Sequence, residues 1–134
     1  MISMTDLREK PAVEWTGRVL SLVVVLALLA DALVALFAPE KMSAEMQTTG
    51  FAPSLASALG LIMLVCAIVY AIPQTAVLGA ILVTGFLGAA ICTHFRLGEF
   101  GSPPQLICLL LGVMTWGGLY LRDHRIRTLL PLRM

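Results

Sequence analysis

The chain has 134 residues, of which 59% are hydrophobic and 13% are charged, and its formal net charge is +1. A soluble domain of this size buries too small a share of its surface to hide so much apolar chain, and a disordered chain needs low hydrophobicity. The near-neutral charge offers no basic face for nucleic acid. The composition therefore predicts an integral membrane protein in contact with the lipid bilayer, and it excludes nucleic acid as a partner.

Three long stretches hold almost no charged residues. Residues 19–39 contain only Asp31, and residues 46–95 and 100–121 contain no Asp, Glu, Lys or Arg. A membrane helix needs about 20 mostly apolar residues, so the middle stretch is long enough for two helices. Pro73 divides this stretch, because proline lacks a backbone donor and displaces the preceding residue from helical geometry.

These stretches predict an all-α fold in which residues 1–134 form a single transmembrane domain, an integral membrane four-helix bundle. The expected spans are residues 17–38, 53–72, 75–95 and 104–121, followed by a basic C-terminal surface segment at 122–134. Helix is required for each span because backbone groups in hydrocarbon must bond within their own segment. Residues 1–14 are expected to form a short polar surface segment.

The distribution of positive charge predicts the orientation of the bundle. An even number of spans places both termini and the Pro73 turn at one end, which we call the inner end. That end would carry Arg8, Lys10, Arg18, Arg122, Arg125, Arg127 and Arg133, and the opposite, outer end only Lys41 and Arg96. Because cytoplasmic loops are enriched in Lys and Arg, we expect both termini in the cytoplasm.

Small residues follow one face of each expected helix. In residues 75–95 this face contains Gly85, Gly88, Ala89 and Cys92, and we expect it to be the tightest packing surface of the chain, because helices in lipid associate through small residues. The other three faces contain Ala27, Asp31, Ala35 and Ala38; Ser57, Gly60, Ala67 and Ala71; and Gln105, Cys108, Gly112 and Thr115. The alternative is that the glycines reflect the ordinary composition of membrane helices.

Asp31 is the most informative single residue of the sequence. It lies about 13 residues beyond Arg18, or roughly 20 Å into a hydrocarbon core about 30 Å thick. A carboxylate at such a depth costs free energy and is a functional-site hypothesis by default. Its position on the small-residue face predicts that it faces the bundle interior. The alternative is a protonated or hydrogen-bonded carboxyl that locks helix packing.

Arg96 is the expected partner of Asp31. A helix that continues from Gly85 to residue 96 returns to nearly the same face, so the long arginine stem could reach inward to the carboxylate. The alternative is an arginine that extends to lipid headgroups. His94 is rotated about 200° from Arg96 and is expected to face away from the small-residue face. We interpret it as a polar residue at the membrane interface, with a ligand-binding role as the alternative.

The remaining polar residues complete a candidate site for a ligand. It comprises Asp31, Arg96, His94, Cys108 and Thr115, with a quinone or a lipid as the candidate ligand. No metal is expected, because no second His, Cys or carboxylate has ligand spacing to His94. Cys66, Cys92 and Cys108 are interpreted as small packing residues, with a pairing of Cys92 and Cys108 as the alternative.

Several segments resemble one known family. They are Gly17–Leu20 with Asp31, Ile72–Ala90 followed by Thr93–Arg96, and Trp116–Asp123 followed by Arg127–Arg133. These segments are similar to DoxX-like proteins. The resemblance implies a four-helix protein of the bacterial inner membrane, and it carries over Asp31, His94, Arg96 and the Trp116–Asp123 run. Relatives often have a glutamate soon after the glycine of the second helix, where this chain has Leu61, Ile62 and Met63.

The resemblance and the small size of the chain suggest two main functions. The first is an accessory or partner-binding component of a membrane complex, since the wider family is named for a subunit of a thiosulfate–quinone oxidoreductase and relatives occur in redox complexes; its partner would be another membrane protein or a second copy. The second is a binder or enzyme for a small lipophilic molecule such as a quinone, with Asp31 and Arg96 holding the polar head. A proton-coupled transporter that uses Asp31 as its titratable group is a third hypothesis, although four helices are few for alternating access.

Overall fold

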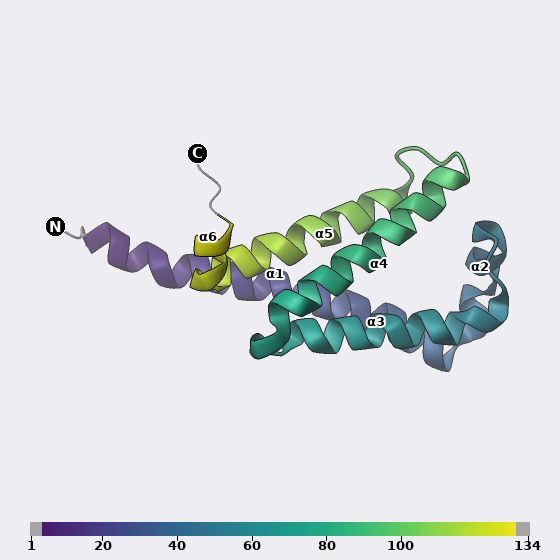
Figure 1. Cartoon of the computed structure of the whole chain (residues 1–134), viewed down its shortest axis with the longest axis horizontal. Coiled ribbons are helices and arrows are strands. Elements are labelled where there is room, and N and C mark those ends of the chain that lie inside the picture. The colour runs from purple at the N-terminus through teal and green to yellow at the C-terminus, as the bar shows by residue number, and fades with distance from the viewer. Residues whose placement is uncertain (1–3, 131–134) are drawn as a thin grey trace.

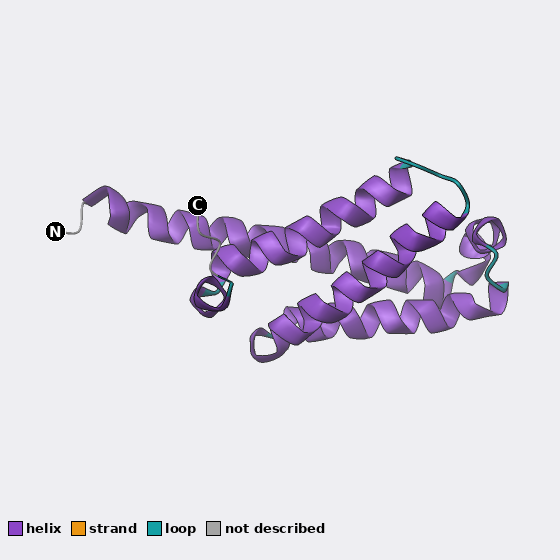
Figure 2. Ribbon diagram, turned by 45° about the horizontal axis from the view of Figure 1, so that its top comes forward, coloured by secondary structure: helices purple, strands orange, loops and turns teal. Residues whose placement is uncertain are grey.

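The computed structural model describes residues 4–130, and the side chains from residue 11 onward (Figure 1). Within that range every regular element is a helix (Figure 2). The long helices are α1 (Met4–Phe37), α3 (Ala56–Ala71), α4 (Ala76–Arg96) and α5 (Pro103–Arg122). The short ones are α2 (Ser43–Thr49) and α6 (His124–Leu129), with single 3-10 turns at Pro39–Met42, Pro53–Leu55 and Pro73–Thr75.

Four helical segments are long and apolar enough to cross a membrane: Pro11–Phe37, Pro53–Ala71, Pro73–Arg96 and Pro103–Arg122. The predicted all-α membrane bundle is therefore confirmed. One boundary differs, because α1 begins at Met4 and runs through Pro11, where a polar surface segment was expected over residues 1–14. Pro11 is the eighth residue of α1, so it removes one backbone hydrogen bond inside the helix, and α1 nevertheless continues through it. Residues 131–134 of the predicted C-terminal surface segment lie outside the described part of the chain.

Prolines define the boundaries of the spans. Ile72 has an extended backbone (ψ 121°) and ends α3, and Pro73 opens the turn that leads into α4. Ser102 is likewise extended before Pro103, the first residue of α5. Proline suits a first helical position because the missing N–H would have no partner there.

The four long helices form a ring in which α1 packs on α3 and α5, and α4 packs on the same two helices. The start of α1, the Pro73 turn and α6 lie at the inner end, and α2 lies at the outer end with the loop between α4 and α5 (Figure 1). The buried core between them includes Val24 and Leu28 of α1, Tyr70 of α3, Val83 of α4 and Leu119 of α5.

Glycines set the distances between the ring's helices. A Cβ atom on Gly118 would lie 2.7 Å from Ser21 Oγ and 3.0 Å from the Gly17 carbonyl oxygen, and one on Gly60 would lie 2.7 Å from the Ala35 Cβ. A Cβ on Gly79 would overlap the Tyr70 backbone. These glycines therefore allow α1 to approach α5 and α3, and α3 to approach α4, more closely than any larger residue would.

The prediction that the small-residue face of α4 packs inside the bundle is wrong. Gly85, Gly88, Ala89 and Cys92 are exposed, and a Cβ on Gly85 or Gly88 would meet nothing within 4 Å. The buried face of α4 contains Ala76, Gly79, Ala80, Val83, Leu87 and His94 instead. This face is rotated around the helix from the small-residue face, because Gly79 makes the close contact with the Tyr70 backbone of α3 and so determines which side of α4 turns inward.

This difference between the glycines predicts opposite effects of the same substitution. Gly118→Ala should lower the free energy of unfolding by about 1–3 kcal/mol, since the new methyl group overlaps atoms of α1. Gly85→Ala should leave stability unchanged or slightly raised, because the methyl group enters open space and alanine favours helix. Reversible unfolding in mixed micelles would measure both. An equal loss of stability in the two variants would contradict the assignment of the close contacts to Gly118.

Candidate functional site

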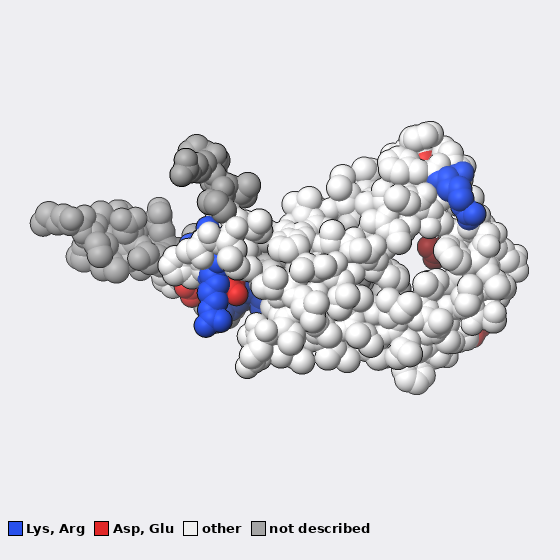
Figure 3. Space-filling model, viewed as in Figure 1, with Lys and Arg blue, Asp and Glu red and all other residues white. Residues whose placement is uncertain are grey.

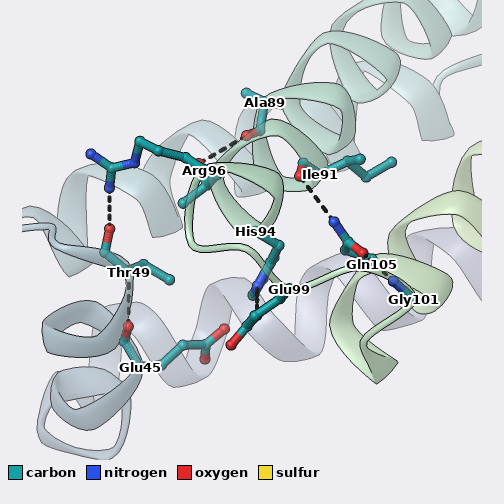
Figure 4. Close-up of polar contacts among 10 residues, drawn as sticks. Glu45, Thr49, Ala89, Ile91, His94, Arg96, Glu99, Gly101 and Gln105 are labelled. Atoms are coloured by element: carbon teal, nitrogen blue, oxygen red, sulfur yellow. Dashed lines mark hydrogen bonds and ion pairs between the residues drawn. The ribbon is translucent and has the colours of Figure 1, made fainter.

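Polar side chains from α2, α4 and the α4–α5 loop gather at the outer end of the bundle (Figure 4). Gln105 is buried at 5% exposure; its Oε1 accepts a hydrogen bond from the Gly101 N–H at 2.8 Å, and its Nε2 donates to the Ile91 carbonyl at 3.5 Å. Gly101 has a φ of +71°, which glycine adopts without strain. Gln105 thus fixes the loop and α5 to the end of α4.

Arg96 belongs to this group but does not reach Asp31. Its Nη2 donates to the Thr49 carbonyl oxygen at 2.6 Å, at the C-terminal end of α2. A cation at a helix C-terminus is favoured because the last carbonyl groups carry partial negative charge. The predicted pairing of Arg96 with Asp31 is therefore wrong: the two form no ion pair among residues 4–130, and the carbonyl of α2 takes the arginine.

His94 is buried and is paired with Glu99 of the loop that follows α4. Its Nδ1 lies 2.6 Å from Glu99 Oε2, and the residue is 8% exposed. As predicted from the helix rotation, it faces away from Gly85 and Gly88, and this direction is the one that points into the bundle. The histidine is consequently part of the packed structure rather than an interfacial side chain.

Asp31 lies toward the outer end of α1, about two turns before Phe37, and its side chain is exposed, so the predicted burial of this carboxylate is wrong. Within the described part of the chain it forms no ion pair. The space-filling view shows an opening between α2, α3 and α4 with acidic atoms at its base (Figure 3). The ring geometry explains the exposure, because α4 lies across the ring from α1 and does not cover it.

The other predicted site residues are dispersed. Thr115 is fully buried, and its hydroxyl donates to the Leu111 carbonyl of its own helix at 2.7 Å. Cys108 is half-buried on the groove between α4 and α5. All three cysteines are free, so the alternative pairing of Cys92 with Cys108 is not formed, and Cys92 is exposed rather than packed. Among the described residues, no three His, Cys, Asp or Glu side chains gather as metal ligands would.

An apolar groove runs between α4 and α5 on the outside of the ring, with a volume of about 710 Å³. Trp116 links its two walls, since its Nε1 donates to Thr84 Oγ1 at 2.7 Å. The groove is lined by Thr84, Leu87, Gly88 and Ile91 from α4; Cys108, Leu109, Gly112, Val113, Trp116, Gly117, Tyr120 and Leu121 from α5; and Leu130. Gly88 and Gly112, predicted as packing residues inside the bundle, instead form part of this open surface.

Sequence reasoning missed the polar cluster at the inner end. Tyr70 is fully buried; its hydroxyl donates to the Thr115 carbonyl at 2.8 Å and lies 3.0 Å from Ser21 Oγ, so that α1, α3 and α5 are joined at one point. The Arg122 guanidinium lies 5.3 Å from the centre of the tyrosine ring. The available signal was a tyrosine three residues before the helix-ending Pro73, at the same depth as Arg18 and Arg122.

Comparison with known proteins gives one result. Neither a curated protein nor a solved structure matches the chain significantly. The model of the DoxX-like family matches residues 19–118, which include most of α1, all of α3 and α4, and α5 as far as Gly118. The match covers well over half of the chain and agrees with the four membrane-spanning helices. The protein is thus a multi-pass membrane protein, and it belongs to the DoxX-like family.

Proposed function

We propose that this chain is a non-catalytic component of a bacterial inner-membrane assembly and that it binds a transmembrane helix of a partner protein. The observation that carries the proposal is the groove between α4 and α5, whose α4 wall continues into the exposed face of Gly85, Gly88 and Ala89. The occurrence of DoxX-like relatives in redox complexes makes a redox-linked or quinone-linked complex the preferred setting.

Small residues allow helices in lipid to approach one another closely. Lipid chains are as apolar as leucine, so a membrane helix gains little from exposing glycine unless another backbone approaches it closely. Gly17, Gly60, Gly79 and Gly118 meet this condition within the bundle. A Cβ added to Gly85 or Gly88 would meet nothing within 4 Å. The pairs Thr84–Gly88 and Gly85–Ala89 have the small-xxx-small spacing that a second helix recognises.

The shape of the groove favours a different protein over a second copy. A two-fold symmetric dimer places the same patch of both chains face to face. Two concave grooves in that arrangement would leave each other unfilled. A single helix from another protein would fill the concavity, with its backbone against Gly88 and Gly112.

Photo-crosslinking in native membranes tests the groove. A photoreactive residue in place of Val113, on the groove wall, should give one discrete adduct, and the same residue in place of Leu61, on the lipid-facing side of α3, should give none. Gly88→Leu should abolish the adduct by filling the groove. Ala58→Leu, which places the same side chain at an exposed position of α3, should leave it intact.

Three outcomes of this experiment would contradict the proposal. They are an adduct of twice the chain's own mass, the absence of any discrete adduct, and an equal loss of the adduct in the two leucine variants. Turnover of a quinone or thiol substrate by the purified chain alone would contradict the non-catalytic part.

The orientation in the membrane is a second prediction. The basic residues of the inner end, among them Arg18, Arg122, Arg125 and Arg127, favour the cytoplasmic side. A green fluorescent protein fused to the C-terminus should fluoresce, and alkaline phosphatase fused at the same point should be inactive. Active phosphatase would show that the inner end is outside the cytoplasm.

A second candidate function is supported by Asp31. Its exposed carboxylate has no ion-pair partner among the described residues and lies toward the outer end of α1, which suits the polar head of a lipophilic molecule such as a quinone. Asp31→Asn should then weaken quinone binding about tenfold or more, the size of a charged hydrogen bond. Titration of the purified protein with a quinone would measure this, and Glu40→Gln, which removes another exposed carboxylate, is the matched control. Unchanged affinity in Asp31→Asn would remove this candidate.

A further inference from the structure

A second, smaller cavity of about 190 Å³ lies at the inner end between α1, α3 and α5. Arg18 and Ser21 of α1, Tyr70 of α3 and Arg122 of α5 form its polar part. Leu22 and Val25 of α1 form its apolar part, on the side toward the middle of the membrane. The cavity does not share a lining residue with the groove between α4 and α5, so it is independent of the proposed partner site.

The arginines supply hydrogen-bond donors that the protein does not use. A guanidinium has five N–H donors. The Nε of Arg122 is buried and has no partner within the described structure, and its Nη2 reaches only the Tyr70 carbonyl, at 3.5 Å. The hydroxyl groups of Ser21 and Tyr70 bond to each other, so the two guanidinium groups are the available binding elements.

The charged groups that line the cavity are both positive. No acidic residue lines the cavity, and neither arginine forms an ion pair with any carboxylate of residues 11–130. Two guanidinium groups from different helices that face one small cavity repel each other unless an anion lies between them. The planar donor fork of arginine matches the oxygen atoms of phosphate particularly well.

The position of the cavity identifies the source of the phosphate. Arg18 and Arg122 lie at the boundary of the membrane-spanning segments, where lipid headgroups are found. Leu22 and Val25 continue the cavity toward the hydrocarbon, one and two helical turns beyond Arg18. A ligand with a phosphate at one end and an acyl chain at the other fits both parts, and basic pockets between membrane helices hold such headgroups.

We propose that this cavity binds the phosphate of an anionic phospholipid, with Arg18 and Arg122 as its ligands and the acyl chain along Leu22 and Val25. Tyr70 positions Arg122, because the guanidinium lies against its ring and its carbonyl. The bound lipid would connect α1 to α5 at the inner end, in addition to the Gly17–Gly118 contact.

Native mass spectrometry of the purified full chain, titrated with phosphatidylglycerol, tests the proposal. Arg18→Gln and Arg122→Gln should each weaken binding at least about fivefold, the effect of one basic residue at an anionic membrane surface. Arg125→Gln removes the same charge from exposed α6, outside the cavity, and should change the affinity little. Phosphatidylcholine should bind more weakly than phosphatidylglycerol, and millimolar inorganic phosphate should not displace the lipid.

Each contrary outcome overturns the proposal. Equal weakening by Arg125→Gln would assign the effect to general surface charge. Displacement by inorganic phosphate would show a site for the free ion, and equal affinity for the two lipids would remove the requirement for an anion. Arg18 is exposed and has no contact with Tyr70 among the described hydrogen bonds, so Arg18→Gln keeps the test valid if Arg122→Gln disturbs folding.

Discussion

The structure depends on close approach between helix backbones at four glycines. In a bilayer the hydrophobic effect does not hold helices together, so packing distance and a few hydrogen bonds decide which helices associate. Gly17 and Gly118 bring α1 to α5, Gly60 brings α3 to α1, and Gly79 brings α4 to α3. The hydroxyl of Tyr70 then bonds across to α5, where an unpaired buried hydroxyl would be costly. The ring order of the four helices follows from these contacts.

The two ends of the ring are built differently. At the inner end, Tyr70 joins three helices around one hydroxyl group, and Arg122 lies against its ring. At the outer end, Arg96 joins the end of α4 to the end of α2, and His94 pairs with Glu99 in the following loop. Asp31 lies toward this end on α1, without an ion-pair partner in the described chain. The outer end is also where the surface opens (Figure 3).

The number, type and approximate limits of the spanning helices could be predicted from the sequence, because uncharged stretches of about 20 residues leave no alternative in lipid. Which face of each helix turns toward the bundle interior could not be predicted. Gly85 and Gly88 have the same small-residue spacing as an interface inside a bundle, and spacing alone does not distinguish an internal neighbour from an external one. Arg96 lies on the predicted helix but bonds to a different partner, because a carbonyl at the end of α2 is not visible in a pattern of side chains.

The length of α1 has a mechanical consequence. Its 34 residues span about 51 Å at 1.5 Å per residue, well beyond a hydrocarbon core of about 30 Å. The excess continues past the inner end as an unbroken rod that begins at Met4 (Figure 1). Membrane helices adjust to bilayer thickness by tilting. When α1 tilts within the bilayer, its N-terminal end therefore moves sideways in the aqueous phase, and the longer the helix, the larger this displacement.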